Sequence, residues 1–109
     1  MRRDVFQAIA DPVRREIIRI LAKEAMTVNA VAEKFAVSRP AISKHLKILE
    51  ECGIVEIDQQ GRERICAIQP ASLIPAFLWL EQYQDLWEER IDSFEKYLID
   101  LQKDKKKNQ

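Results

Sequence analysis

The sequence has little of several things on which enzymes and secreted proteins depend: its 109 residues include two glycines, two cysteines and one histidine. So little glycine excludes the Gly-rich phosphate loop of common nucleotide-binding enzymes. Two cysteines form neither a disulfide framework nor a four-ligand zinc set. A single histidine, without a nucleophile paired to a base, gives no support for catalysis. We therefore expect a protein that is not an enzyme and has no metal site or other cofactor.

The sequence also lacks an excess of charge of either sign and a long apolar run. Its 18 Lys and Arg residues balance 18 Asp and Glu residues, so any attraction to nucleic acid has to be local. No apolar stretch approaches the roughly 20 residues that span a bilayer, and the first residues do not read as a signal peptide. We expect a cytoplasmic protein that does not associate with membranes.

What the sequence does have is a series of helix signals in its first half. Asp11 followed by Pro12 indicates the start of a helix that continues to about Lys23. Thr27 and Ser38 are capping residues for two further helices, joined by a short link. A short helix, a tight link and a second helix form the helix-turn-helix pattern.

The helix that follows Ser38 combines an apolar face with a basic one and is expected to end at Gly53. Its predicted buried stripe consists of Ile42, Leu46 and Leu49. The segment 38–49 has three basic residues and no acidic one, and a helix with such a surface fits the major groove of DNA. The candidate DNA contacts on this helix are Ser38, Arg39, Pro40, Ser43, Lys44 and Lys47. The alternative interpretation is an ordinary solvated basic face.

His45 lies on the same helix and has two interpretations. The helical wheel places it beside the buried stripe, which favours a packed side chain that orients the helix. The alternative is a contact with a phosphate or a base from the edge of the groove.

Two β-type runs within residues 54–68 flank a polar, turn-rich segment, residues 58–62, and predict a hairpin. In a winged helix-turn-helix the hairpin lies beside the recognition helix, where its tip can contact the minor groove or the DNA backbone. The candidate contacts on the hairpin are Gln60, Arg62 and Arg64. Because acidic residues dilute this charge, the alternative is a hairpin that only covers the fold.

After Pro70 and Pro75 the pattern predicts one helix to about Lys103 and then a basic tail, residues 104–109. Apolar residues follow this helix at spacings of three and four: Ala76, Leu80, Tyr83, Trp87, Ile91, Phe94, Leu98 and Leu101. Burying a large apolar side chain is worth about 1.5–3 kcal/mol, so we expect the stripe to pair with a second copy of the chain. The alternative, a core within one chain, is expected for the N-terminal part of the stripe. The residues expected at this homodimer interface are Val5, Phe6, Ile9, Leu80, Tyr83, Trp87, Ile91, Phe94 and Leu98.

Four segments, spread in order over most of the range 4–68, resemble the ArsR family of bacterial winged-helix transcriptional repressors. They are FQAIADPVRREI at 6–17, SRPAISKHLKIL at 38–49, GIV at 53–55 and GR at 61–62. The resemblance implies a mainly α winged helix-turn-helix with a small β-hairpin wing and a long C-terminal dimerisation helix. The expected single domain, 1–109, has a core at 1–70 with the wing at 54–68, a dimerisation helix at 71–103 and a tail at 104–109.

The resemblance implies a sequence-specific DNA-binding regulator, a repressor that binds a near-palindromic operator in double-stranded DNA as a homodimer. It also assigns DNA contact to His45, together with Ser38, Arg39, Ser43 and Lys44. An inducer is a further partner that the resemblance allows and that no residue identifies. The alternative function is a winged-helix module that binds a protein instead of DNA.

The sequence departs from the metal-sensing members of that family. Those members carry Cys-x-Cys in the helix corresponding to residues 27–35, or Asp and His ligands on the last helix, and this sequence has no Cys or His in either place. An acidic face on the last helix is expected to be solvated rather than to bind a hard cation: Glu81, Asp85, Glu88, Asp92 and Glu95. Cys52 and Cys66 are expected to be buried small side chains, with a redox pair as the alternative.

Overall fold

The computed structural model describes residues 3–107, except for the side chains of residues 91–92 and 105–107. The chain divides into two compact units, Met1–Ala76 and Phe77–Gln109, which we call unit 1 and unit 2. The division falls within a helix, α5 (Ile74–Glu81).

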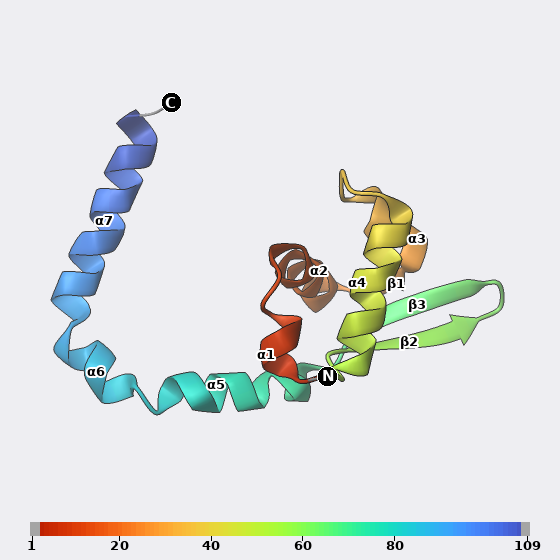
Figure 1. Cartoon of the computed structure of the whole chain (residues 1–109), viewed down its shortest axis with the longest axis horizontal. Coiled ribbons are helices and arrows are strands. Elements are labelled where there is room, and N and C mark those ends of the chain that lie inside the picture. The colour runs from red at the N-terminus through yellow and green to blue at the C-terminus, as the bar shows by residue number, and fades with distance from the viewer. Residues whose placement is uncertain (1–2, 108–109) are drawn as a thin grey trace. The chain divides into compact units, whose positions relative to one another are not determined.

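In its described residues, unit 1 combines short helices with a small antiparallel sheet (Figure 1). Its helices are α1 (Val5–Ala8), α2 (Pro12–Lys23), α3 (Val28–Glu33) and α4 (Arg39–Glu51). Its strands are β1 (Met26–Thr27), β2 (Val55–Gln60) and β3 (Glu63–Ile68), in the spatial order β1-β3-β2. A 3-10 helix, Pro70–Leu73, leads into α5.

Side-chain caps determine where α2, α3 and α4 begin. The Asp11 carboxylate accepts hydrogen bonds from two backbone N–H groups in the first turn of α2. Thr27 and Ser38 each accept one from the first turn of α3 and α4. Gly53 follows the end of α4 at φ 79°, a left-handed conformation that glycine adopts without steric cost. These three predicted caps and the predicted glycine stop are confirmed.

The core of unit 1 lies where α2, α3 and α4 pack against the sheet. The predicted stripe of α4 is confirmed, because Ile42, Leu46 and Leu49 are at most 1% exposed. The largest fully buried side chains are Ile17, Leu21, Val31, Ile42, Leu46, Leu49, Ile54 and Cys66. Since this stripe faces the core, the opposite face of α4 is turned to solvent.

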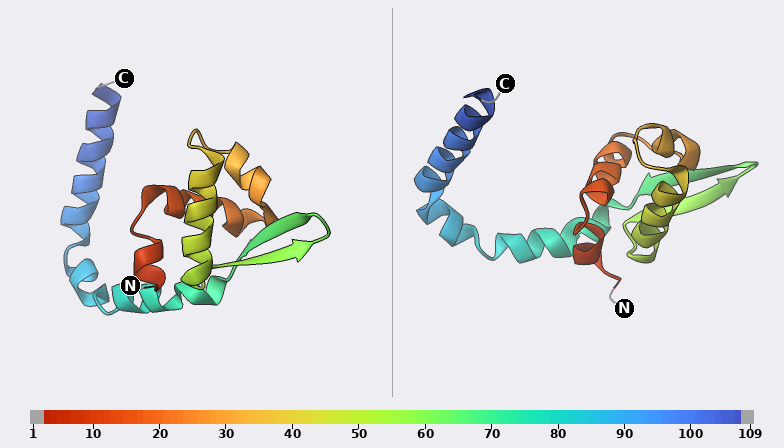
Figure 2. Two further views of the ribbon diagram at one scale, coloured as in Figure 1. Left: turned by 45° about the vertical axis from the view of Figure 1, so that its right-hand side comes forward. Right: turned by 45° about the horizontal axis from the view of Figure 1, so that its top comes forward.

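The hairpin of β2 and β3 is longer than expected, and its turn is tighter. The ladder runs from the pair Val55 and Ile68 to the pair Gln60 and Glu63, so only Gly61 and Arg62 remain in the turn. The polar residues 58–60 were expected in the turn. They continue the strand instead, because the outer half of the hairpin is exposed to solvent, where polar side chains suit a strand (Figure 2).

Strand β1 was not predicted. Its two residues pair with β3 in the register Met26 to Cys66 and Thr27 to Ile65. A two-residue strand is too short to show an alternating pattern, and it exists only because β3 lies beside it. The sheet therefore has three strands where a hairpin of two was expected.

The single helix predicted from Pro75 to Lys103 is wrong in two respects. The segment forms three helices: α5, α6 (Gln84–Glu89) and α7 (Ile91–Lys107). At the first break the Gln82 side chain donates to the carbonyl of Trp79, and at both breaks a backbone N–H bonds three residues back instead of four. The second error is that α7 continues beyond Lys103 to Lys107, so most of the expected tail is helical; residues 108–109 lie outside the described residues.

None of the helices in the described range 3–107 combines the length and the apolar character needed to cross a bilayer.

Candidate nucleic-acid interface

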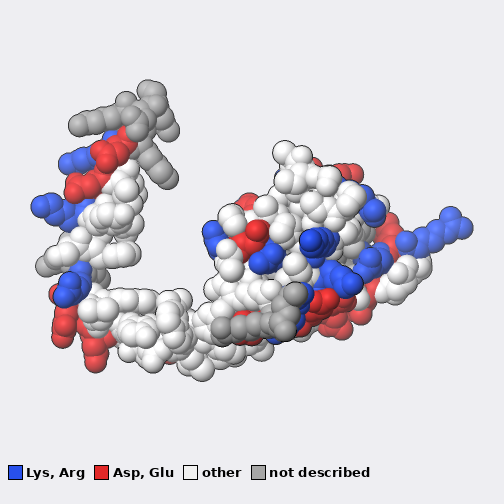
Figure 3. Space-filling model, in the orientation of Figure 1, with Lys and Arg blue, Asp and Glu red and all other residues white. Residues whose placement is uncertain are grey.

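The solvent face of α4 carries a basic surface although the chain has no net charge. Arg39, Lys44 and Lys47 are exposed on this helix, as are Ser38 and Pro40 at its start. Lys and Arg side chains gather over α4 and continue along the hairpin, with acidic side chains along the lower edge of the same face (Figure 3). The local basic surface expected from the sequence is therefore present.

Arg39 is held at the first turn of α4 by a residue of α3. Its Nε donates to Oδ1 of Asn29 at 2.7 Å. A guanidinium has five N–H donors, so this bond restricts the orientation of Arg39 and leaves its other donors for a ligand. Asn29 was not predicted, because this contact joins residues ten apart across the link between the two helices.

Arg64 lies beside α4. On β3 it points to the same side of the sheet as buried Cys66, two residues along, and therefore toward the helix. A hollow of about 290 Å³ separates α4 from the hairpin and is lined by Val28, Ser43, Lys47, Glu50, Ile57 and Arg64. The structure thus brings Ser43, Lys47 and Arg64 together.

The other two hairpin candidates lie at the far end of the strands. Gln60 is the last residue of β2, Arg62 follows Gly61 in the turn, and both are exposed. The turn is braced by Gln59, whose side-chain amide donates to the carbonyl of Gly61 at 2.9 Å. Arg62 is therefore presented from a two-residue turn with a defined conformation.

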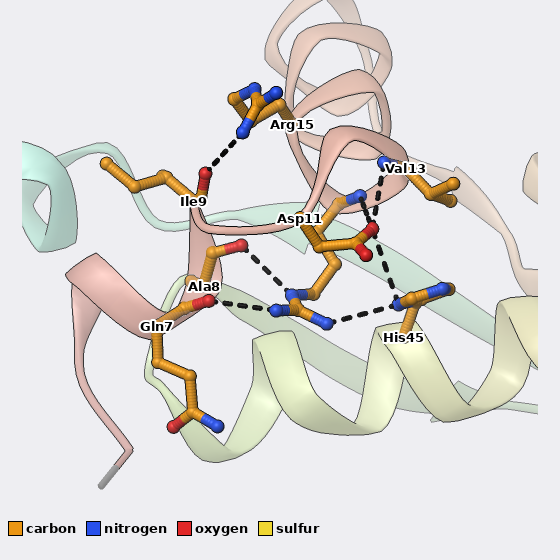
Figure 4. Close-up of polar contacts among 8 residues, drawn as sticks. Gln7, Ala8, Ile9, Asp11, Val13, Arg15 and His45 are labelled. Atoms are coloured by element: carbon orange, nitrogen blue, oxygen red, sulfur yellow. Dashed lines mark hydrogen bonds and ion pairs between the residues drawn. The ribbon is translucent and has the colours of Figure 1, made fainter.

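His45 belongs to a polar cluster that joins α4 to the junction of α1 and α2 (Figure 4). Its Nδ1 lies 3.3 Å from Nη1 of Arg14 and 3.9 Å from Oδ2 of Asp11. Arg14 also donates to the carbonyl oxygens of Ala8 at 3.0 Å and Gln7 at 2.9 Å. His45 is therefore half-buried and packed against its own chain on one side, as its position on the helical wheel suggested.

Two neighbouring arginines complete the end of α1. Arg14 donates hydrogen bonds to the last two carbonyl oxygens of α1, and Arg15 donates one to the carbonyl of Ile9 at 2.8 Å. The carbonyl of Gln7 also accepts from the backbone N–H of Ala10, and a cation at a helix C-terminus complements the unpaired carbonyl groups and the helix dipole. Arg14 and Arg15 thus secure α1 on the start of α2.

The environment of Asp11 favours its ionised form. Burial raises its pKa, but the N–H of Arg14, His45 in its protonated form, the N–H of Val13 and the charge of Arg14 together lower it below the ordinary value of 3.8. An ionised Asp11 both caps α2 and lies next to the cluster of Arg14 and His45.

The two cysteines are free thiols. Cys66 is fully buried and Cys52 partly so, and burial is the main cause that raises the pKa of each. A raised pKa keeps a thiol protonated and unreactive, which agrees with the expectation of small apolar side chains.

The acidic face of the last helices does not assemble a ligand set in the described part of the chain. There, no group of three or more His, Cys, Asp or Glu side chains is placed to hold a metal ion. Of the acidic residues considered above, the side chain of Asp92 lies outside the description.

The predicted dimerisation residues fall into two groups. Leu80, Tyr83, Trp87, Phe94 and Leu98 are all exposed, and Phe94 is 62% exposed. In unit 1, Val5 is only 5% exposed and belongs to the core of its own chain, while Phe6 and Ile9 are partly buried against that core. The side chain of Ile91 lies outside the described residues.

A helix-turn-helix formed by α3 and α4, followed by an antiparallel hairpin whose Arg64 lies beside α4, defines a winged helix-turn-helix protein. The family model described as bacterial regulatory protein, arsR family, matches residues 11–56. The transcriptional repressor SdpR of Bacillus subtilis (strain 168) is 34% identical over 77 residues, which cover 71% of this chain and 86% of SdpR. The chain belongs to the ArsR family of bacterial regulatory proteins.

Two solved structures extend the comparison. The crystal structure of an ArsR-family transcriptional regulator matches with a TM-score of 0.69 and 38% identity, covering 76% of this chain and 91% of that one. A homodimeric winged helix-turn-helix DNA-binding domain from Mycobacterium bovis, solved by NMR, matches with a TM-score of 0.60 and 25% identity. That match covers 74% of this chain and 75% of the other. The winged helix-turn-helix fold expected from the sequence is confirmed.

Proposed function

We propose that this chain is a homodimeric transcriptional repressor that binds a near-palindromic operator in duplex DNA. The observation that carries the proposal is that α4 and the hairpin meet around one hollow, where Lys47 and Arg64 lie with Ser43 and one acidic residue, Glu50. Membership of a family of bacterial regulatory proteins supports it. Because the net charge is zero, this local surface has to supply the attraction to DNA.

The basic residues divide into two roles. Arg39 is held by Asn29 at the start of α4, and a fixed guanidinium suits a bidentate contact with a guanine in the major groove. Lys47 is an exposed point charge near the other end of α4 and suits a phosphate contact. Arg62, at the hairpin turn, can reach the adjacent backbone or minor groove.

The second copy of the chain is proposed to cover the apolar surface of unit 2. Large apolar side chains there are about half exposed, and Leu86, Trp87, Arg90 and Phe94 line a hollow of about 530 Å³. A related domain from M. bovis is homodimeric. A two-fold dimer would place two recognition helices about one turn of DNA apart, and bound there it would exclude the polymerase from a promoter.

Two further proposals concern the location of the protein and the absence of catalysis. We propose that the protein acts in the cytoplasm, where promoter DNA is found, and that it has no catalytic activity. The operator is the proposed macromolecular ligand.

The test is a salt titration of binding to DNA from the region upstream of the protein's own gene, compared with a scrambled duplex. Arg39→Ala is expected to cost about 1–3 kcal/mol on the cognate duplex and much less on the scrambled one. Lys47→Ala is expected to weaken both equally and to reduce the slope of log K against log salt by about 1. Footprinting on the same DNA locates the operator.

Lys34→Ala is the matched control, because Lys34 is exposed at the end of α3 and lines a different surface, beside Glu16 and Arg19. It is expected to change neither specificity nor salt slope. Equal weak binding of wild type to both duplexes, or tight binding to an acidic protein surface instead, would contradict the proposal.

A further inference from the structure

The contact between Arg14 and His45 restricts where the imidazole carries its proton. A guanidinium has N–H donors and no acceptor, so Nδ1 of His45 can bond to Arg14 only through a lone pair. In a neutral imidazole, a lone pair on Nδ1 places the proton on Nε2. The competing arrangement, in which Nδ1–H donates to Asp11, is disfavoured because 3.9 Å exceeds hydrogen-bond distance.

Arg14 cannot easily turn away from His45. Its Nε and Nη2 are bonded to the carbonyl oxygens of Ala8 and Gln7, which fixes the plane of the guanidinium and directs Nη1 toward His45 of α4. The planar guanidinium therefore joins the end of α1 to the recognition helix through one rigid group.

The other ring nitrogen of His45 faces away from this cluster. Nε2 lies on the opposite side of the ring from the nitrogen that meets Arg14 (Figure 4). Among the described side chains, Oε1 of Gln7 is the buried polar atom that lacks a hydrogen-bond partner, so Nε2 of His45 is not a buried, unpaired atom. Since Nε2 has no hydrogen bond to another described residue, it lies at the surface of α4.

We propose that Arg14 is a positioning residue that holds His45 as the Nε2-protonated tautomer, so that α4 presents an N–H donor to DNA at this position. The proposal rests on the DNA-binding function proposed above. An N–H donor matches a phosphate oxygen, the N7 of either purine, a guanine O6 or a thymine O4, and it mismatches the amino groups of adenine and cytosine. Arg14 thus determines which chemical groups position 45 accepts without touching DNA itself.

The tautomer can be measured without DNA, because His45 is the only histidine in the sequence. A long-range ¹H–¹⁵N spectrum of the full chain, recorded at a pH where the imidazole is neutral, should show an unprotonated Nδ1 and a protonated Nε2. In Arg14→Met the donor is absent, so Nδ1–H can turn to Asp11 and the Nδ1-protonated form should rise. Arg15→Met is the matched control, because it removes the same charge and one hydrogen bond to the end of α1. The Arg15 side chain bonds to the carbonyl of Ile9 and not to His45.

A protonated Nδ1 in the wild type would overturn the proposal, as would the same tautomer shift in both variants. If Arg14→Met fails to fold, a pair of substitutions at His45 keeps the question open to test. Gln places an amide near the position of Nε2, and Asn places one near the position of Nδ1.

His45→Gln is expected to stay within about threefold of wild-type affinity for the cognate duplex. His45→Asn should fall about tenfold, the worth of one hydrogen bond to a charged group, and should match His45→Ala. The reverse order would overturn the proposal, because His45 would then act only through Arg14. Wild-type protein that binds no duplex would overturn the proposed function, while the spectrum would still decide whether Arg14 fixes the tautomer.

Discussion

Units 1 and 2 use similar apolar residues in different ways. In unit 1, side chains from α2, α3, α4 and the sheet converge into one core, and eight large ones are fully buried, from Ile17 to Cys66. In unit 2, every residue whose side chain is described is exposed, including two tryptophans and two phenylalanines. An apolar residue is a core residue only where the chain folds a second layer onto it.

The difference indicates which part of the chain would gain from a partner under the proposed function. Leaving a large apolar side chain in water forfeits about 1.5–3 kcal/mol, which is a substantial share of the stability of a small domain. Unit 1 recovers this free energy within itself, and unit 2 does not. Under the proposed function, unit 1 supplies the DNA-binding surface and unit 2 supplies the surface for the second copy.

Leu46→Ala is the substitution with the largest expected effect. Leu46 is 1% exposed in the centre of the core, so its truncation should lower the free energy of unfolding by about 2–5 kcal/mol. Urea unfolding followed by far-UV circular dichroism measures the change. Val37→Ala, at an exposed apolar residue of the same unit, should stay within about 0.5 kcal/mol. Similar losses in the two variants would remove the distinction between buried and exposed apolar residues on which the comparison depends.

Phe94→Ala tests the other side of the comparison and should affect association rather than folding. Phe94 lines the hollow of unit 2, so its truncation should weaken the dimer at least tenfold, about 1.4 kcal/mol. Sedimentation equilibrium measures this change. Both tryptophans, Trp79 and Trp87, lie in unit 2, so their fluorescence emission should shift to the red when dilution dissociates the dimer. In Phe94→Ala this shift should occur at a higher protein concentration than in the wild type.

Glu95→Gln is the control for Phe94→Ala, because Glu95 is an exposed charged residue next to it on α7. It should leave the dimer constant unchanged. A wild-type chain that stays monomeric at every concentration would show that unit 2 has another partner or none, and it would contradict the proposed homodimer.

Much of unit 1 could be predicted from sequence because its signals are local. Asp11, Thr27 and Ser38 each satisfy N–H groups two or three residues away, and such a cap works whatever the rest of the chain does. The buried stripe of α4 follows from helical periodicity alone. The candidate basic residues of α4 were found by the same reasoning, as the remaining face of that helix.

The parts that sequence reasoning missed depend on contacts between distant residues. Asn29 and Arg14 act on the site only because folding brings α3 and α2 against α4, so neither has a local signature. Strand β1 exists only beside β3. In unit 2 the breaks come from a side-chain bond by Gln82 and a tightened backbone turn, and neither interrupts the three-and-four spacing that indicated one helix.

Asp11→Ala is the smallest of the expected effects and the most specific to unit 1. Removing an N-cap acceptor should cost about 1 kcal/mol at neutral pH. Because the pKa of Asp11 is lower in the folded chain than its ordinary 3.8, the stabilisation is complete above that value and is lost as the pH falls through the lower, folded pKa. The stability difference between wild type and Asp11→Ala should therefore shrink in acid, as followed by urea unfolding at a series of pH values.

Asp11→Asn separates the cap from the charge, because Asn accepts the same N–H bonds without titrating. Near pH 7 it should recover most of the stability lost in Asp11→Ala, and its advantage over Asp11→Ala should persist in acid, where the advantage of wild type fades. Hydrogen exchange should place the change at the first turn of α2 and leave α7 unaffected, since α7 belongs to unit 2. Faster exchange in α7 would mean that the two units do not unfold independently, which would contradict the distinction between a self-sufficient unit 1 and a partner-dependent unit 2.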